Sequence, residues 1–407
     1  MTDTQRPETV PDTPIVATTA ALADSVVSSF DASTAQEVDA LIIGAGPVGL
    51  FTAFQLGLQG VQAHICDTLP VMGGQCIELY ADKPIYDIPG IPLCTGRELA
   101  EKLQQQIAPF ASIFHPRTQV AQLLAQGDGR WRVQLQGQEQ GQEPAPNGDG
   151  STWLLAKTIF VTAGVGAFVP KQLRLPGIDA LVGRQVFYHP DLGDAWVAQQ
   201  AAAVAPSKAP KIVVHGGDEA AVQAAVAAAQ HPLLAPASVV LLHRRDQFSA
   251  PQALLDTLAS LRASGRVEVV VGMPQSLEAS EDGEAARLQA MAYIDADGQD
   301  QRLPCDQLWV CQGISPKLGP LLEWGLAIEK KQLQVAIDTF ATSATGIYAA
   351  GDIVSYPGKR KLILSGFYEA TMAAMAAIDY LRGEKLLLEY TTTSKRLHER
   401  LGVSHPD

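Results

Sequence analysis

The stretch VDALIIGAGPVGLFTAFQLGLQG, residues 38–60, decides the fold. It begins with a short apolar run, Val38–Ile43, which is typical of a buried strand. A glycine-rich turn follows, and then a segment from Pro47 to Gly60 that reads as a helix. A second strand over Gln62–Cys66 completes a strand–helix–strand unit. We therefore predict an open, doubly wound α/β domain in this part of the chain.

The turn itself reads GAGPVG, a complete G-x-G-x-x-G pattern between strand and helix. In such a turn Gly44 allows the tight bend, Gly46 lets the backbone approach a pyrophosphate, and Gly49 permits close packing of helix on strand. The helix that begins at Pro47 presents amide donors to phosphates. Asp67 ends the second strand, where a carboxylate accepts hydrogen bonds from ribose hydroxyls. The pattern predicts dinucleotide binding, with a plain glycine-rich turn as the alternative.

A second strand–turn–helix unit starts in the middle of the chain. Lys211–Val214 predicts a strand, Glu219–Ala229 an alanine-rich helix, and Ser238–Leu242 the next strand. The turn reads HGGDEA, which keeps the G-x-G-x-x-A spacing but has His215 in place of the first glycine. A side chain there can crowd the tight turn, although the amide donors of the helix remain. The turn residues offered to a second nucleotide are Gly216, Gly217 and Asp218.

Three basic residues, His243, Arg244 and Arg245, follow the second strand of this unit. A guanidinium group binds a phosphate through two hydrogen bonds, whereas an acid at this place would repel it. Two adjacent arginines therefore favour the 2′-phosphate of NADP over the free ribose of NAD. The alternative is a basic turn that only faces solvent.

Composition limits the class of protein. A chain of 407 residues suggests two or three domains, and 47% hydrophobic with 18% charged residues is ordinary for a globular protein. Lys+Arg 30 against Asp+Glu 43 gives a net charge of −13, which argues against binding to nucleic-acid phosphates. No apolar run reaches the ~20 residues that a membrane span needs.

The five cysteines are odd in number and form no C-x-x-C pair. A disulfide scaffold or a metal site is therefore not expected, and a reducing cytoplasm suits the chain. Residues 1–36 are rich in Thr, Ser, Asp and Pro and lack the apolar segment of a signal peptide. We expect them to form a mobile N-terminal extension.

The two units predict two nucleotide-binding domains, and we expect the following layout. We expect two Rossmann-like three-layer domains, of which the first is discontinuous in sequence. Its two parts would be residues 37–167 and 317–407, the second including the C-terminal tail. Residues 168–316 would form the other domain between them.

Several short motifs resemble a known family. The segments YADKPIYDIPG, residues 80–90, and YPGKRKLILSGFYE, residues 356–369, are similar to those of the thioredoxin-reductase-like class of ferredoxin/flavodoxin–NADP+ reductases. The resemblance covers about residues 38–395 and implies FAD in the first domain, NADPH in the second, and a homodimer. The motifs that occur in the order of such two-dinucleotide-domain flavoproteins are Gly44–Gly49, Gly73–Gln75, Thr162–Gly164, Gly216–Ala220, His243–Arg245 and Gly351–Asp352.

The same resemblance implies roles for single residues. Asp67 would hold the adenosine ribose of FAD, Asp352 the ribityl chain, and Tyr80 would stack on one flavin face. Tyr390 would cover the other face from the partner subunit, and ordinary packing is the alternative for both tyrosines. The residues implied for FAD are Gly44, Gly46, Pro47, Gly49, Asp67, Gly74, Gln75, Tyr80, Asp87, Asp352, Tyr390 and Thr391. Those implied for NADP are Gly216, Gly217, Asp218, His243, Arg244 and Arg245.

The function implied is that of a ferredoxin–NADP+ reductase. NADPH would give hydride to the flavin N5, and the flavin would pass single electrons to an acidic carrier, a ferredoxin or flavodoxin. No acid–base residue of the protein is required for this chemistry. Two alternatives stay open: a reductase with another acceptor such as a quinone, and a flavin-binding regulator that no longer oxidises NADPH. His215 is the residue that keeps the second alternative open.

The cysteines argue against a disulfide reductase. Cys76 follows the Gly73–Gln75 motif, but Ala81 stands where the redox motif of glutathione-reductase-type enzymes has its second cysteine. Cys305 and Cys311 flank a strand-like run and are expected to pack as small apolar groups.

Local positive charge suggests where an acidic partner would dock. Lys359, Arg360 and Lys361 follow Asp352, whereas the chain as a whole is acidic. We expect these three residues to form a docking patch, since complementary charge raises association rates. The alternative is an ordinary solvated surface.

Overall fold

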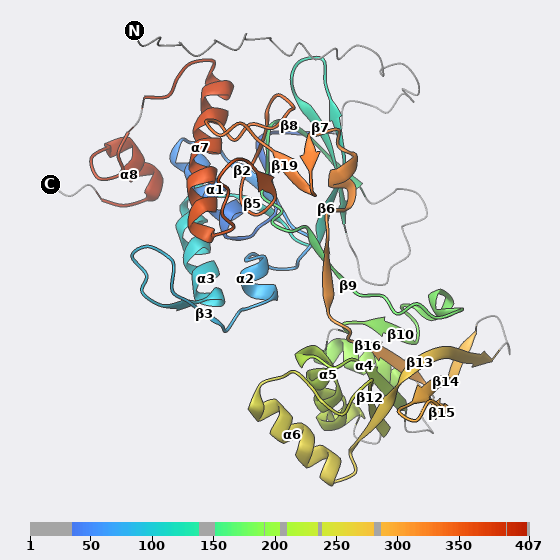
Figure 1. Cartoon of the computed structure of the whole chain (residues 1–407). Helices are drawn as coiled ribbons and strands as arrows, with labels where there is room; N and C mark the ends of the chain where they lie inside the picture. Colours follow the sequence, from blue (N-terminus) through green and yellow to red (C-terminus); the bar gives the residue numbers. More distant parts are fainter. Residues whose placement is uncertain are drawn as a thin grey trace, which may run out of the picture.

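The computed structural model describes residues 35–137, 151–190, 192–203, 210–234, 238–280, 286–387 and 389–404. These residues form two domains, each built on a seven-stranded sheet (Figure 1). The N-terminal and C-terminal parts of the chain share the first domain, and the middle forms the second. The predicted α/β class with a discontinuous first domain is therefore confirmed. Residues 1–34 of the predicted extension lie outside the described residues.

The first domain starts with the predicted strand–helix–strand unit. Strand β1, Gln36–Ile43, leads into helix α1, Pro47–Leu58, and strand β2 follows at Ala63–Cys66. β1 pairs in parallel with β2 on one side and with β8, Ser151–Val161, on the other. The carboxyl ends of these strands therefore meet at one edge of the sheet, just before α1 begins.

The rest of this sheet mixes parallel and antiparallel strands. Its order is β5-β2-β1-β8-β7-β6, and β20 pairs with β8 in parallel. β7 pairs antiparallel with both of its neighbours. The remaining strands are β5 Ile113–His115, β6 Thr118–Ala125, β7 Trp131–Gly137 and β20 Ile347–Ala349.

Alternate residues of β1 pack into two separate hydrophobic cores, one on each face of the sheet. Ala40 and Ile42 pack under a layer of helices formed by α1, α3 (Gly96–Ile107) and α7 (Ile363–Arg382). Leu41 and Ile43 pack on the other face. Period-2 alternation with both faces buried is expected of a central parallel strand. The smaller elements on these faces are α2 Gln75–Glu78, β3 Pro84–Ile85, β4 Cys94–Thr95, η2 Ala108–Phe110, η5 Gly319–Glu323, β18 Ile328–Glu329, β19 Gln332–Gln334 and β21 Val354–Ser355.

The second domain repeats the arrangement. Its sheet has the order β10-β16-β11-β12-β13-β14-β15, parallel from β10 to β13 and antiparallel beyond. The predicted strands and helix around the HGGDEA turn are present as β11, α5 and β12. The bounds are β10 Val186–Tyr188, β11 Lys211–His215, β12 Ser238–His243, β13 Val267–Ser280, β14 Arg287–Asp295, β15 Asp300–Pro304 and β16 Gln307–Val310. The helices are η3 Ile178–Leu181, α4 Asp194–Ala203, α5 Glu219–Gln230, η4 Pro232–Leu234 and α6 Gln252–Ala263.

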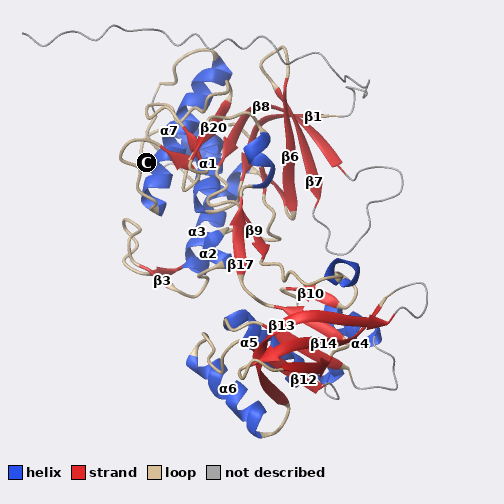
Figure 2. Cartoon of the chain, turned by 45° about the vertical axis from the view of Figure 1, so that its right-hand side comes forward, coloured by secondary structure: helices blue, strands red, loops and turns tan. Residues whose placement is uncertain are grey.

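Two strands run between the domains. β9, Ala167–Pro170, and β17, Ile314–Lys317, form an antiparallel ladder that leaves the first domain and enters the second (Figure 2). The predicted boundaries at 167/168 and 316/317 fall within this ladder.

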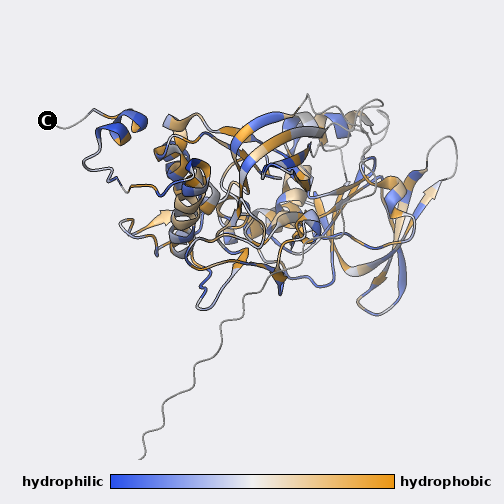
Figure 3. Cartoon of the chain, turned by 90° about the horizontal axis from the view of Figure 1, so that it is seen from above, coloured by the Kyte–Doolittle hydropathy of each residue, from blue (hydrophilic) through white to orange (hydrophobic). Residues whose placement is uncertain are grey.

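The C-terminal helix α8, Lys395–Leu401, lies at the outer edge of the first domain and is largely hydrophilic (Figure 3). Its Arg400 donates a hydrogen bond of 2.5 Å to the carbonyl of Leu58, at the end of α1. Among the described helices, none combines the length and the apolar character needed to cross a membrane.

Candidate functional site

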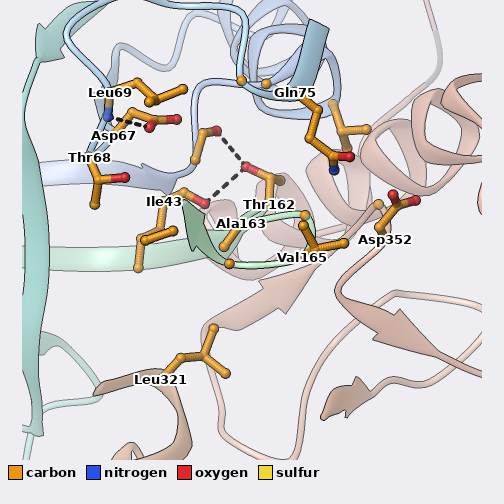
Figure 4. Close-up of a pocket in the computed structure, with 18 of the residues that line it drawn as sticks. Ile43, Asp67, Thr68, Leu69, Gln75, Thr162, Ala163, Val165, Leu321 and Asp352 are labelled. Atoms are coloured by element: carbon orange, nitrogen blue, oxygen red, sulfur yellow. Dashed lines mark hydrogen bonds between the residues drawn. The ribbon is translucent and has the colours of Figure 1, made fainter. Parts of the chain in front are cut away.

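A deep cleft opens at the carboxyl edge of the first sheet (Figure 4). Its walls come from the turn after β1, the end of β2, the turn after β8 and the turn after β20. Asp67 lies at one end and Asp352 at the other, with Thr162 between them. The predicted FAD residues that line the cleft are Gly44, Gly46, Pro47, Asp67, Gly74, Gln75, Tyr80 and Asp352.

At Gly44 and Gly49 a side chain would clash with the neighbouring backbone, and Gly44 also has a backbone conformation that favours glycine. Gly44 has φ +108°, and a Cβ at this position would lie 2.5 Å from the carbonyl oxygen of Thr162. A Cβ on Gly49 would lie 1.9 Å from the carbonyl oxygen of Gly44, so this glycine sets how closely α1 approaches β1. Gly49 does not line the cleft, and its place fits the packing role expected of the third glycine.

The start of α1 is open toward the cleft. Its N-cap is Gly46, which has no side chain to cap the helix, and Pro47 occupies the first turn. The first backbone N–H groups of a helix have no partner within the helix, and they carry partial positive charge. An uncapped helix start beside a cleft is therefore suited to bind phosphate oxygens.

Asp67 is held rigidly at one end of the cleft. Its Oδ2 accepts a hydrogen bond of 2.7 Å from the backbone N–H of Ala45, and its Oδ1 accepts one of 2.9 Å from Leu69. Burial raises the pKa of Asp67, and these backbone donors oppose the rise. Thr162 locks the turn from the other side, donating to the carbonyls of Ile43 and Gly44.

The opposite end of the cleft joins residues distant in sequence. Gly74 has φ +53°, and a Cβ there would lie 2.8 Å from the Cα of Gly46, so the two glycine turns touch. Tyr80 is half-buried, and burial together with Cys76 raises the pKa of its hydroxyl. Tyr80 therefore stays protonated at neutral pH.

A buried cluster supports the turn that carries Asp352. Glu369, on α7, is fully buried, and its Oε2 accepts a 2.7 Å hydrogen bond from the N–H of Gly351. Its Oε1 accepts hydrogen bonds from the hydroxyl of Tyr356 at 2.7 Å and from Nζ of Lys359 at 2.5 Å. Because three donors from one loop converge on a single carboxylate, the loop is fixed relative to α7.

This cluster corrects the predicted docking patch. The side chain of Lys359 is only 8% exposed, and its charge is paired with Glu369 inside the domain. Lys359 is therefore unavailable to a partner protein. Arg360 and Lys361 are exposed, and Lys361 lines the mouth of the cleft.

Three other residues predicted for FAD do not line the cleft. Asp87 is exposed and does not line it. Tyr390 is 64% exposed, and Thr391 beside it is exposed, with its carbonyl accepting a hydrogen bond from Nε2 of His398. A site made by this chain alone does not include these three residues.

The second turn is crowded by neighbouring groups. A Cβ on Gly216 would lie 1.9 Å from the carbonyl oxygen of Cys311, and one on Gly217 would lie 2.3 Å from the ring of His243. Asp218 is the N-cap of α5 and accepts a 3.1 Å hydrogen bond from the N–H of Ala221.

The basic residues after β12 lie beside this turn. Nδ1 of His243 lies 3.0 Å from the carbonyl of Arg245, which orients the imidazole. Arg244 and Arg245 are both exposed at the carboxyl end of the strand. Two exposed guanidinium groups next to a glycine turn and a helix start are an arrangement that suits a phosphorylated nucleotide.

His215 does not crowd the second turn as the sequence suggested. It is the last residue of β11, is 6% exposed, and its φ is not positive. Its Nδ1 lies 3.1 Å from the carbonyl oxygen of Leu242 on β12, so the ring lies along the edge of the sheet. Burial lowers the pKa of His215 to about 4.

Several residues that line the cleft were missed by the sequence analysis. Thr118 and Gln119 come from β6, and Trp324 follows the short helix η5. They lie outside any motif, because the fold of the discontinuous domain alone brings them there. Thr162 had a signal in the Thr162–Gly164 motif, at the carboxyl end of a parallel strand.

All five cysteines are buried and unpaired. Cys305 and Cys311 are 0% and 1% exposed, which confirms their predicted packing role. Burial raises the pKa of the Cys76 thiol to about 11 and that of Cys311 to about 12. At neutral pH these thiols are protonated and are poor nucleophiles.

Comparisons with known proteins agree with this geometry. The model of the pyridine nucleotide-disulphide oxidoreductase family matches residues 38–378. A ferredoxin–NADP reductase of Acidovorax sp. is 53% identical over 91% of this chain and 97% of its own length. One from Verminephrobacter eiseniae is 50% identical over 90% and 97%. The solved bacillithiol disulfide reductase of Bacillus cereus has TM-score 0.51 and 17% identity, covering 85% of this chain and 100% of that one.

Proposed function

The chain belongs to the pyridine nucleotide-disulphide oxidoreductase family, and on that premise we propose that it is an FAD-dependent ferredoxin–NADP reductase. Its relatives of that name match it along nearly their whole length. The observation that carries the proposal is the pairing of two nucleotide turns in one chain. One lies beside an acid, Asp67, and the other beside two arginines, Arg244 and Arg245.

The residues of the cleft fit FAD. Gly44 allows the tight turn, and the space beside Gly46 is open, with no protein atom closer than 4.0 Å to a Cβ there, next to an uncapped helix start suited to the pyrophosphate. Asp67 would accept hydrogen bonds from the adenosine ribose, and Asp352 from the ribityl hydroxyls. Gly74, Gln75 and Tyr80 would lie along the flavin. When bound, FAD supplies the change from two-electron to one-electron transfer.

The second turn fits NADPH. Gly217 and the start of α5 would face the pyrophosphate, and Arg244 and Arg245 would bind the 2′-phosphate through charge-assisted hydrogen bonds. His243 would support these arginines, because its imidazole is hydrogen-bonded to the backbone carbonyl of Arg245.

The cysteines favour a separate carrier protein as the electron acceptor. Disulfide chemistry needs two thiols in reach of each other, whereas Cys76 is followed by Ala81 at the expected position of its partner. Cys76 itself is buried and protonated. A one-electron carrier such as ferredoxin fits this arrangement better than a disulfide substrate.

The surface near the cleft suggests how the acidic carrier would dock. Arg360 and Lys361 are exposed, and Lys361 lines the cleft, so we revise the docking patch to these two residues. Tyr390 is a large aromatic residue exposed on the same domain, and we propose that it covers the flavin of a second subunit in a homodimer. The unpaired cysteines favour a cytoplasmic location.

Anaerobic stopped-flow absorbance tests the proposal. The purified protein is mixed with NADPH and then with oxidised ferredoxin, and the series is repeated with NADH. We expect NADPH to bleach the visible flavin band and ferredoxin to restore it. Bleaching that ferredoxin does not reverse would assign another acceptor. A bound flavin that NADPH does not bleach would overturn the reductase function.

A further inference from the structure

A histidine and a glutamine meet at the carboxyl edge of the second sheet. Nε2 of His215 lies 2.8 Å from the side-chain nitrogen of Gln312. His215 ends β11, and Gln312 follows the neighbouring strand β16 by two residues. The register pairs His215 with Val310, so the two side chains come from adjacent strand ends.

The hydrogen bonds determine which atom of each group carries a proton. The carbonyl of Leu242 can only accept, so Nδ1 of His215, 3.1 Å away, must be the protonated nitrogen. At neutral pH the ring is uncharged, and Nε2 is then an acceptor. Gln312 must therefore donate from its amide NH₂ to His215.

In this orientation the side-chain carbonyl of Gln312 is not the atom that faces His215. Its Oε1 has no hydrogen-bond partner among the described residues, and the side chain is half-buried. The backbone around it is anchored on both sides. Cys311 donates a 2.8 Å hydrogen bond to the carbonyl of His215, and the carbonyl of Gly313 accepts one of 3.0 Å from Lys171.

The order of strands places Gln312 relative to a nucleotide. Along the carboxyl edge, β16 comes first, then β11 with its glycine turn, and then β12 with Arg244 and Arg245. A dinucleotide lies across this edge with its pyrophosphate at the turn. If its 2′-phosphate lies at the arginines after β12, its other half extends over the end of β16, where Gln312 lies.

We propose that Gln312 is a specificity-determining residue whose Oε1 accepts a hydrogen bond from the nicotinamide nucleoside half of NADPH, and that His215 is a positioning residue that holds this amide. The proposal rests on the proposed function, which supplies the dinucleotide. It also explains the histidine in place of the first glycine of the turn. A glycine at 215 would leave the amide of Gln312 free to rotate, whereas the imidazole fixes which end faces the ligand.

Isothermal titration calorimetry with two ligands separates this role from a structural one. NADP+ has both halves, whereas 2′,5′-ADP has only the half that the arginines would bind. For Gln312→Leu we expect NADP+ to bind about tenfold more weakly and 2′,5′-ADP to bind as to the unaltered protein. Gln223→Leu is the matched control, since Gln223 is exposed on α5 of the same domain and bonds only to Glu219.

A second variant tests the positioning role. In His215→Asn the amide can still donate to Leu242 but is too short to hold Gln312. We expect NADP+ to bind about threefold more weakly, again without change for 2′,5′-ADP. Because the two residues act as one unit, the double variant should be no weaker than Gln312→Leu alone.

The outcomes are distinct. Equal losses for both ligands in Gln312→Leu would show a structural effect and overturn the proposal, and so would no loss for either. Additive losses in the double variant would remove the positioning role of His215. Failure of the unaltered protein to bind either ligand would instead overturn the proposed function itself.

Discussion

Both nucleotide turns join a strand to a helix, but they differ in the residues that form the turn and begin the helix. In the first, Gly44 has a backbone conformation that excludes side chains, and the start of α1 is uncapped. In the second, His215 fills the place of that glycine, and Asp218 caps α5. We therefore expect the first turn to bind a nucleotide by close approach of its backbone, and the second to rely on side chains.

Asp67, after β2, and His243, at the end of β12, differ in a similar way. Asp67 accepts a hydrogen bond from the N–H of Ala45 and so belongs to its own turn. His243 lies against Gly217 and is bonded to Arg245, so it belongs to the basic group. A backbone-built site suits a cofactor that stays bound, whereas a side-chain site suits a coenzyme that must leave after each turnover.

The largest effect should follow from adding a side chain to the first turn. In Gly44→Ala the Cβ would meet Thr162 at 2.5 Å in a backbone conformation that alanine avoids, which costs about 3 kcal/mol or more. We expect loss of bound flavin, measured as visible absorbance per protein after gel filtration. Gly265→Ala is the control, because Gly265 also has positive φ (+72°) but no atom lies near its Cβ. Flavin retained in Gly44→Ala would remove the contrast between the turns.

The next largest effect should come from lowering the pH, which changes the free energy of unfolding in opposite directions through His215 and Asp67. The unfolded chain protonates His215 near pH 6.5, whereas the folded chain does so only near pH 4. Folding therefore excludes this proton, and stability falls by about 3 kcal/mol as pH decreases from 6.5 to 4. The raised pKa of Asp67 has the opposite sign, since the folded state binds that proton more tightly.

Urea unfolding at pH 7 and pH 4 measures this difference. His215→Asn cannot titrate, so its loss of stability between the two pH values should be smaller than that of the unaltered protein by about 3 kcal/mol. The comparison between proteins is needed because burial also lowers the pKa values of His64 and His115. An identical loss in both proteins would mean that His215 is not the buried neutral group described above.

The basic group should show a smaller effect that depends on the coenzyme. In Arg244→Ala/Arg245→Ala we expect kcat/KM for NADPH to fall about thirtyfold, roughly 2 kcal/mol, with little change for NADH. Arg302→Ala is the control, since Arg302 lies in the same domain and pairs with Glu278. An equal fall in kcat/KM for both coenzymes would show that the arginines do not bind the 2′-phosphate.

The smallest effect concerns the helix starts. Asp218→Ala removes the cap of α5 and should lower the free energy of unfolding by about 1 kcal/mol. Gly46→Ala at the start of α1 removes no cap, and its Cβ would have no protein atom closer than 4.0 Å, so the stability of the flavin-free protein should change little. Thermal unfolding of both variants measures the difference, and equal losses would contradict it.

Local motifs could be predicted from sequence because backbone geometry determines them. The strands, the two turns and the place of Asp67 follow from short patterns of glycine and apolar residues. Asp352 could be placed because it follows a strand of the same sheet.

Long-range partners could not be predicted. From the sequence, Lys359 is predicted to be an exposed cation. In the structure it pairs with the buried Glu369, and no local sequence pattern marks a buried glutamate. The pairing of His215 with Gln312 joins strands almost a hundred residues apart. Trp324, which comes after the second domain in sequence, and Gln119, on β6, both line the cleft although neither belongs to a recognisable motif.

The two ends of α1 connect the C-terminal tail to the cleft. While the start of the helix faces the proposed pyrophosphate site, its last carbonyls are held by two guanidinium groups, Arg400 on Leu58 and Arg382 on Gln59. A helix is an aligned dipole, and cations at its negative pole stabilise it by about 0.3–1 kcal/mol each. The tail of the chain thus stabilises the end of the helix whose start faces the proposed pyrophosphate site, and truncation before Arg400 would remove the partner of the Leu58 carbonyl.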